Sequence, residues 1–197
     1  EHSYTLNRLI FSLTLFIMTA IELLLQRQST PSLTTPAPSE EVLKQILAAG
    51  MRVPDHACLK PWHFTVVTDD GLNRLSELLV ASSNEQTANL EKIAKMPFRA
   101  PMIIIVSTSF VKHEKVPKQE QLITAGCTAH AMQMAAYSLG YGAIWRTGQL
   151  AYNKKVKQGL EISAQNEIIG FLYIGTPCKE QVLKATKSFD GKVSYWK

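Results

Sequence analysis

The sequence predicts a mixed α/β fold built in layers, and three observations lead to this class. Segments with the spacing of amphipathic helices alternate along the chain with short β-branched and apolar segments. One of these, Met102–Val106, contains no polar residue, which is the pattern of a central strand covered on both faces. The long helical segment Gln119–Leu139 has small residues and methionine all round its middle, so it must be buried in the core or against a second copy.

The first half of the chain opens with an expected amphipathic helix at Met18–Arg27 and an extended Ser-, Thr- and Pro-rich loop. Ser39 is a good N-cap for the next helix, because its side chain can accept a hydrogen bond from a free backbone N–H. The pattern then predicts a strand at Phe64–Val67, a helix around Leu72–Leu79 and a polar, exposed helix at Asn84–Lys95.

The second half continues from the central strand into the long helix, in which Cys127 is expected to be a buried packing residue. Gly140 is expected to end that helix, and a short strand and loop follow. Asn153 should cap another helix, and Ile168–Gly175 reads as a second buried strand. The Lys-rich tail that follows either wraps over a partner subunit or hangs free.

Composition limits the class of protein. With 197 residues, 46% hydrophobic and 19% charged, the chain suits one globular domain with short appendages. The net charge of +5 is spread out, without a basic stripe and interleaved aromatics, which argues against a nucleic-acid partner. Three widely spaced cysteines without a C-x-x-C pair argue against a zinc site or a disulfide scaffold and favour a reducing compartment, the cytoplasm.

The apolar stretch Leu9–Ile21 allows two interpretations. It is shorter than the roughly 20 residues that span a bilayer, and no clean signal-peptide cleavage site follows it. We favour Met18 as the natural start, with residues 1–17 as an upstream extension and no membrane partner. The alternative is a membrane-anchored interaction module that uses this stretch as its anchor.

The residues that could carry chemistry are cationic and aromatic rather than acidic. No nucleophile elbow, phosphate-binding glycine loop or metalloprotease motif is present, and no pair of carboxylates stands out. Arg27, Arg52 and Arg146 instead lie in or beside loops, and guanidinium groups suit phosphate because their donors are fixed and bidentate. Pro54 and Pro61 stiffen the loop that carries Arg52, so it either holds a flat anion or is an ordinary helix-to-strand connection.

An ordered set of segments resembles a known family. The segments are Ile21–Leu24, Gln26–Ser29, Ala49–His56, Pro61–Phe64, Pro97–Pro101, Ala125–Cys127, Ala131–Ala136, Gly142–Gly148 and Gly170–Pro177. Together they resemble the FMN-dependent nitroreductases in their short, YdjA-type form. The resemblance implies a three-layer sandwich with a mostly antiparallel sheet flanked by helices, in an intertwined homodimer with FMN at its interface. It divides the chain into the extension 1–17, an FMN-binding domain at 18–178 and a tail at 179–197.

The resemblance also implies which residues bind the cofactor. They are Arg27, Gln28, Ser29, Arg52, His56, Trp145, Arg146 and Thr147. The first three match the segment that holds the flavin phosphate and ring edge. The family usually has Arg where this chain has Gln28, which removes one charge but leaves an amide that can donate hydrogen bonds.

The implied activity is an NAD(P)H-dependent flavin oxidoreductase. Hydride would pass from NAD(P)H through flavin N5 to a nitroaromatic, a quinone or a similar small-molecule acceptor, in a ping-pong sequence. The flavin carries this chemistry and the protein binds and orients it, which accounts for the lack of an acid/base pair and requires no metal. Gln28 leaves open an alternative, a flavin-storing or flavin-sensing protein with little turnover.

Overall fold

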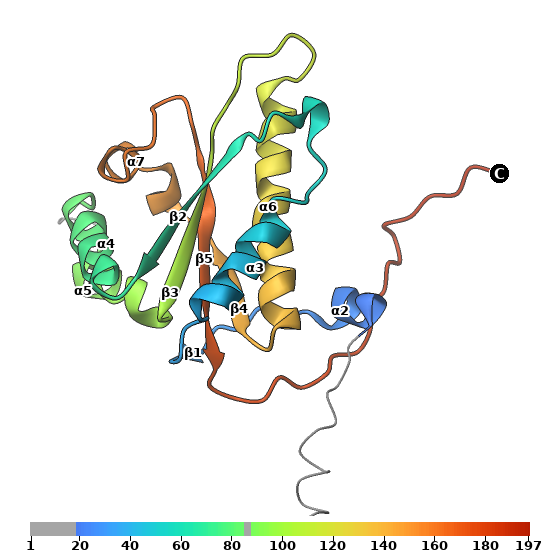
Figure 1. Cartoon of the computed structure of the whole chain (residues 1–197), viewed down its shortest axis with the longest axis horizontal. Coiled ribbons are helices and arrows are strands. Elements are labelled where there is room, and N and C mark those ends of the chain that lie inside the picture. The colour runs from blue at the N-terminus through green and yellow to red at the C-terminus, as the bar shows by residue number, and fades with distance from the viewer. Residues whose placement is uncertain (1–18, 85–87) are drawn as a thin grey trace, which may run out of the picture.

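The computed structural model describes residues 19–84 and 88–197 (Figure 1). The expectations for residues 1–17, and most of the stretch Leu9–Ile21, lie outside these residues. The helices are α2 (Ala20–Gln26), α3 (Glu40–Gly50), α4 (Asp70–Ala81), α5 (Leu90–Ala94), α6 (Lys118–Ser138) and α7 (Lys154–Gly159). The strands are β1 (Leu33–Thr34), β2 (Trp62–Thr68), β3 (Met102–Thr108), β4 (Gly142–Arg146) and β5 (Ile168–Pro177). Short 3₁₀ turns are η1 (His56–Cys58), η2 (Pro97–Arg99) and η3 (Gln149–Tyr152).

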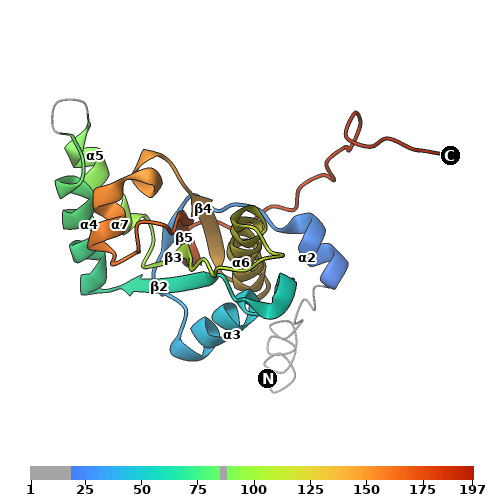
Figure 2. The same cartoon turned by 90° about the horizontal axis from the view of Figure 1, so that it is seen from above.

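The sheet confirms the predicted class. Its order is β1-β5-β3-β2, with β4 also paired to β5, and each of these pairings is antiparallel. Helices α3 and α6 cover one face, and α4, α5 and α7 cover the other, so the molecule has three layers (Figures 1 and 2).

Strand β3 shows why an uninterrupted apolar run predicts a central strand. Ile103 and Ile105 face the cluster that contains α4 and α7, whereas Ile104 and Val106 face the cluster that contains α3 and α6. Successive side chains of a strand point to opposite faces, so a strand between two helical layers needs apolar residues at every position.

Local capping chemistry sets most helix starts. Ser39 Oγ accepts from the N–H of Val42 at 3.4 Å, and Asn153 Oδ1 accepts from the N–H of Lys155 at 2.8 Å, as predicted. The predicted helix Asn84–Lys95 is wrong in length, because α5 covers only Leu90–Ala94. Asn89 caps it by accepting from the N–H of Lys92 at 2.8 Å, so the helix begins after that residue.

Helix α6 is buried on one side only in the isolated chain. Ala125, Ala129 and Met132 face the sheet, whereas Ile123 is 61% exposed. Cys127 was expected to be a buried packing residue, but it is exposed in the single chain. The small residues of α6 therefore do not all pack against other parts of the same chain. Exposed apolar side chains lie near both ends of α6: Leu122 and Ile123 are close to its start, and Ile21, Leu24 and Leu25 are on α2, which contacts it. These five residues are here called the α2–α6 face.

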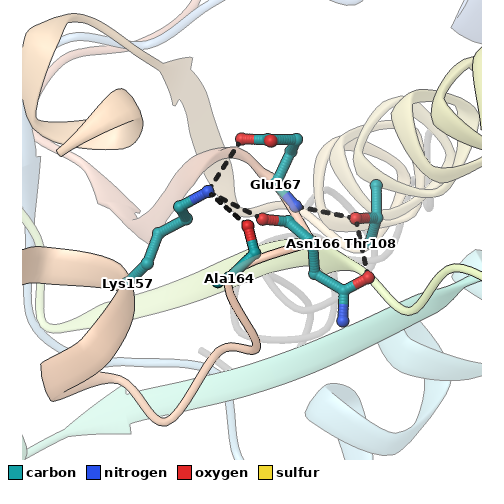
Figure 3. A network of polar contacts seen from close by, with 5 residues as sticks. All are labelled: Thr108, Lys157, Ala164, Asn166 and Glu167. Carbon is teal, nitrogen blue, oxygen red and sulfur yellow. Dashed lines mark hydrogen bonds and ion pairs between the residues drawn. The ribbon is translucent and has the colours of Figure 1, made fainter. Parts of the chain in front are cut away.

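A buried lysine, Lys157 of α7, lies where strand β3 ends and strand β5 begins. Lys157 Nζ donates to the carbonyl of Asn166 at 3.0 Å and lies 3.2 Å from Glu167 Oε2 (Figure 3). The N–H of Glu167 donates to Thr108 Oγ1 at 2.8 Å, and the N–H of Thr108 returns a bond to the carbonyl of Glu167 at 2.8 Å. These bonds join the loop before β5 to the end of β3. No motif in the sequence predicted them.

Candidate functional site

The segment Arg27–Ser29 follows directly after α2. The N–H of Arg27 donates to the carbonyl of Leu23 at 3.0 Å, which makes Arg27 the C-cap of the helix. Its side-chain Nη1 is buried and has no hydrogen-bond partner among the described residues. The N–H of Thr30 donates to the carbonyl of Ala143 at 3.0 Å, so the segment is fixed against the start of β4.

The C-terminal tail lies against this segment. Gln28 Nε2 donates to the carbonyl of Val182 at 2.9 Å, and Gln181 Nε2 donates to Thr30 Oγ1 at 3.0 Å. A cavity of about 350 Å³ lies between this segment and the tail, and Gln28, Ser29 and Lys184 are among its lining residues. The first residues of the tail therefore do not hang free. No sequence pattern signals this contact, which joins residues more than 150 positions apart.

The loop with Arg52 and His56 contains left-handed backbone. Ala57, Cys58 and Lys60 have φ values of 61°, 53° and 50°. The N–H of Lys60 donates to Asp55 Oδ2 at 2.7 Å, which closes the bend. His56 and Arg52 are both exposed on this loop.

A contact to α6 fixes this loop in place. His56 Nδ1 lies 3.1 Å from Glu120 Oε2, in the first turn of α6. Sequence inspection missed Glu120 as a partner, because 64 residues separate it from His56.

Residues Trp145–Thr147 end β4 and begin the loop after it. Trp145 packs in the cluster with α6, and its Nε1 donates to the carbonyl of Ile169 at 3.2 Å. Gly170 lies so close that a Cβ there would be 2.2 Å from Trp145 Nε1. The Arg146 guanidinium carbon lies 5.9 Å from the centroid of the Tyr173 ring. Tyr173 belongs to the cluster on the sheet face that α4 and α7 cover. Trp145 and Arg146 therefore point to opposite faces of the sheet.

The structure does not bring the predicted residues together around one cavity of a single chain. His56 contacts Glu120 in the first turn of α6. The Ala143 carbonyl, which accepts from the N–H of Thr30, also accepts from Gln133 Nε2 at 3.2 Å. Gln133 lies in the last turns of the same helix. At 1.5 Å per residue, Glu120 and Gln133 are about 20 Å apart along the axis. Figure 1 shows η1 and α2 at opposite ends of α6. Two of the predicted segments, Arg27–Ser29 and Arg52–His56, therefore lie apart within one chain, and they are here called the two half-sites of the predicted cofactor site.

The described residues 19–84 and 88–197 contain no group of three or more His, Cys, Asp or Glu side chains arranged to hold a metal ion. Within the same residues, no helix has the length and apolar content needed to cross a membrane.

Comparisons with known proteins identify the family. Residues 24–176 match the model of the nitroreductase family. A protein of Escherichia coli (strain K12) named "Putative NAD(P)H nitroreductase YdjA" is 44% identical over 177 residues, which cover 88% of this chain and 94% of that protein.

Solved structures share the fold. A nitroreductase-like family protein from Bacillus cereus superposes with a TM-score of 0.81 at 20% identity, covering 90% of this chain and 96% of the other. A nitroreductase with bound FMN from Bacteroides fragilis NCTC 9343 gives a TM-score of 0.67 at 22% identity, covering 90% and 98%. With the sequence match over residues 24–176 and the 44% identity to a named relative, the chain belongs to the nitroreductase family.

Proposed function

We propose that this protein is an FMN-dependent oxidoreductase that takes hydride from NAD(P)H and delivers it to a nitroaromatic, a quinone or a similar small acceptor. The name of the 44% identical relative supports the NAD(P)H donor. The FMN bound in the nitroreductase from B. fragilis supports the cofactor. The free cysteines are consistent with the cytoplasm, where we place the protein.

The observation that carries the proposal is the buried, unpartnered Nη1 of Arg27 within the described part of the chain. A buried donor without an acceptor is costly, so such atoms generally mark a ligand or water. The phosphate of FMN carries close to two negative charges and three strong acceptor oxygens. A guanidinium at the end of α2 with a buried, unpartnered Nη1 is suited to such a group.

Arg52 and His56 have proposed roles that follow from their positions. Arg52 is exposed, so its charge is available to a ligand at the molecular surface. His56 is oriented by Glu120 at 3.1 Å, and the backbone of the next residue, Ala57, is left-handed. When bound, FMN supplies the two-electron chemistry itself, so these side chains have only to bind and orient it.

We propose that the working form is a homodimer. The exposed apolar side chains of the α2–α6 face, such as Ile123 at 61% and Leu24 at 62%, are unlike a free surface. Pairing two chains through this face buries those side chains. It would also let the Arg27–Ser29 half-site of one chain meet the Arg52–His56 half-site of the other. Within one chain, the α6 residues Glu120 and Gln133, which mark the two half-sites, are about 20 Å apart along the helix axis.

A flavin-storing or flavin-sensing protein is the second candidate, and Gln28 favours it. The usual arginine is missing at this position, and the Gln28 amide donates to the carbonyl of Val182. A weaker phosphate site and a tail held beside it would suit retention of flavin more than fast turnover.

The experiment is a flavin titration of the purified protein followed by anaerobic reduction. The protein should bind FMN, and its flavin absorbance should bleach on addition of NADH or NADPH. Arg27→Gln should weaken FMN binding about 10- to 150-fold, because a hydrogen bond to a charged group contributes about 1.5–3 kcal/mol. Arg74→Gln is the matched control, since Arg74 is exposed on α4.

The outcomes separate the candidates. Tight FMN with no reduction by either nicotinamide would support storage or sensing. A protein that binds no FMN, or an Arg27→Gln variant with parental affinity, would refute the proposed phosphate site.

A further inference from the structure

Two arginines from distant segments line one small cavity on the sheet face away from α6. Arg99 belongs to η2, within the Pro97–Pro101 segment that the family resemblance left without a role, and Arg146 ends β4. The cavity has a volume of about 110 Å³. Thr147, Phe171 and Tyr173 also line it.

The positive charge at this cavity is not paired with a carboxylate of the described residues. Neither Arg99 nor Arg146 forms an ion pair with any carboxylate of residues 19–84 and 88–197. Within the same residues, Arg146 Nε is buried and lacks a hydrogen-bond partner. Burying a guanidinium N–H without an acceptor costs free energy, because the donor loses its hydrogen bond to water. Two arginines beside one cavity also repel each other.

Tyr173 lines the same cavity as both arginines. Burial raises the pKa of its hydroxyl, and the charges of Arg99 and of Arg146 both oppose that shift. The Arg146 guanidinium also lies over the Tyr173 ring, at 5.9 Å from its centroid. The two arginines therefore converge on one ring at the wall of the cavity.

We propose that this cavity is a binding site for a small oxyanion of the phosphate or carboxylate class. Guanidinium groups present paired donors to such oxygens, and an anion between Arg99 and Arg146 would satisfy Arg146 Nε and neutralise the repulsion. At about 110 Å³ the cavity is well below the roughly 300–1,000 Å³ of cofactor and drug pockets, so it excludes FMN. An anion here would join η2, the end of β4 and the loop at Thr147.

This site is separate from the proposed phosphate site at Arg27. Arg27 is not among the residues that line the cavity, which lies on the α4 and η2 side of the sheet. Arg146 and Thr147, which the family resemblance assigned to the cofactor, line this cavity, so Arg99 and the flavin-free protein are used to distinguish the two sites.

The test is anion-dependent thermal stability of the FMN-saturated full chain, with phosphate, sulfate or acetate compared with chloride at constant ionic strength. An oxyanion at about ten times its Kd should raise Tm by roughly 3–6 °C. A response to phosphate and sulfate alone assigns the tetrahedral class, and a response to acetate alone assigns carboxylates. Arg99→Gln should abolish the shift and Arg99→Lys should reduce it, whereas Arg74→Gln should keep the parental shift.

A second arm distinguishes this cavity from the cofactor site. In the flavin-free protein, Arg27→Gln should leave the Arg99-dependent shift intact. A shift that is lost in Arg27→Gln but kept in Arg99→Gln would overturn the proposal, as would the absence of any oxyanion effect on the parent. Crystals soaked in selenate give a direct measurement that needs no variant. Anomalous density between Arg99 and Arg146 supports the site, and density elsewhere alone refutes it.

Discussion

Replacing Lys157 by methionine tests whether the buried lysine holds β3 and β5 together at their shared end. The Lys157 side chain is only 10% exposed, and its ammonium reaches three oxygens, the carbonyls of Ala164 and Asn166 at 3.4 and 3.0 Å and Glu167 Oε2 at 3.2 Å (Figure 3). Methionine keeps most of the apolar stem and of the volume, so the change removes mainly the charge and its hydrogen bonds.

The size of the loss follows from these three contacts. A hydrogen bond to a charged group contributes about 1.5–3 kcal/mol and a neutral one about 0.5–1.5 kcal/mol. The Glu167 side chain is 46% exposed, so water can replace part of its interaction, and removing the ammonium also removes the cost of burying it. We therefore expect Lys157→Met to lower the free energy of unfolding by about 2–3 kcal/mol, or roughly 4–12 °C in Tm.

Urea unfolding followed by circular dichroism, at one fixed protein concentration, measures this loss. Lys155→Met is the matched control, because Lys155 lies on the same helix with its side chain exposed. A double-mutant cycle with Glu167→Gln isolates the ion pair from the two carbonyl contacts. A loss below about 0.5 kcal/mol, equal to that of Lys155→Met, would show that the network does not stabilise the fold.

Three further substitutions test the packing and the assembly. Gly170→Ala should cost about 2–4 kcal/mol, because its Cβ would lie 2.2 Å from Trp145 Nε1, and near-parental urea unfolding would contradict this contact. Ile123→Asp should shift the protein from dimer to monomer in sedimentation velocity, because it puts a charge on the α2–α6 face; an unchanged dimer excludes Ile123 from the interface. Ala57→Gly should raise the free energy of unfolding by about 0.5–1 kcal/mol, since φ is 61° there, whereas Ala48→Gly within α3 should lower it.

The features that the sequence predicted correctly are those determined by neighbouring residues. Ser39 and Asn153 cap helices because a side-chain oxygen two or three residues away can reach a free N–H. The apolar run in β3 predicts a central strand because both faces of such a strand are covered. In both cases the determining contacts are local, or depend only on the pattern of burial.

The features that the sequence could not predict depend on pairs of residues far apart in the chain. Gln28 meets Val182, and Arg99 lines a cavity with Arg146, through long-range folding that no local pattern encodes. The exposure of Cys127 in the single chain has a related reason. A small-residue helix indicates close packing, but the pattern does not say whether the partner is the same chain or another one.

Helix α6 links these observations, because both half-sites are attached to it. Glu120 in its first turn contacts His56, and Gln133 in its last turns donates to the Ala143 carbonyl that also holds Thr30. A rigid helix keeps the half-sites a fixed distance apart within one chain, so no loop movement of ordinary size can join them. If the cofactor needs both, the exposed apolar residues of the same helix must bring in the second chain. Cofactor binding and dimer formation are then coupled equilibria, and Ile123→Asp should weaken FMN binding although Ile123 belongs to neither half-site.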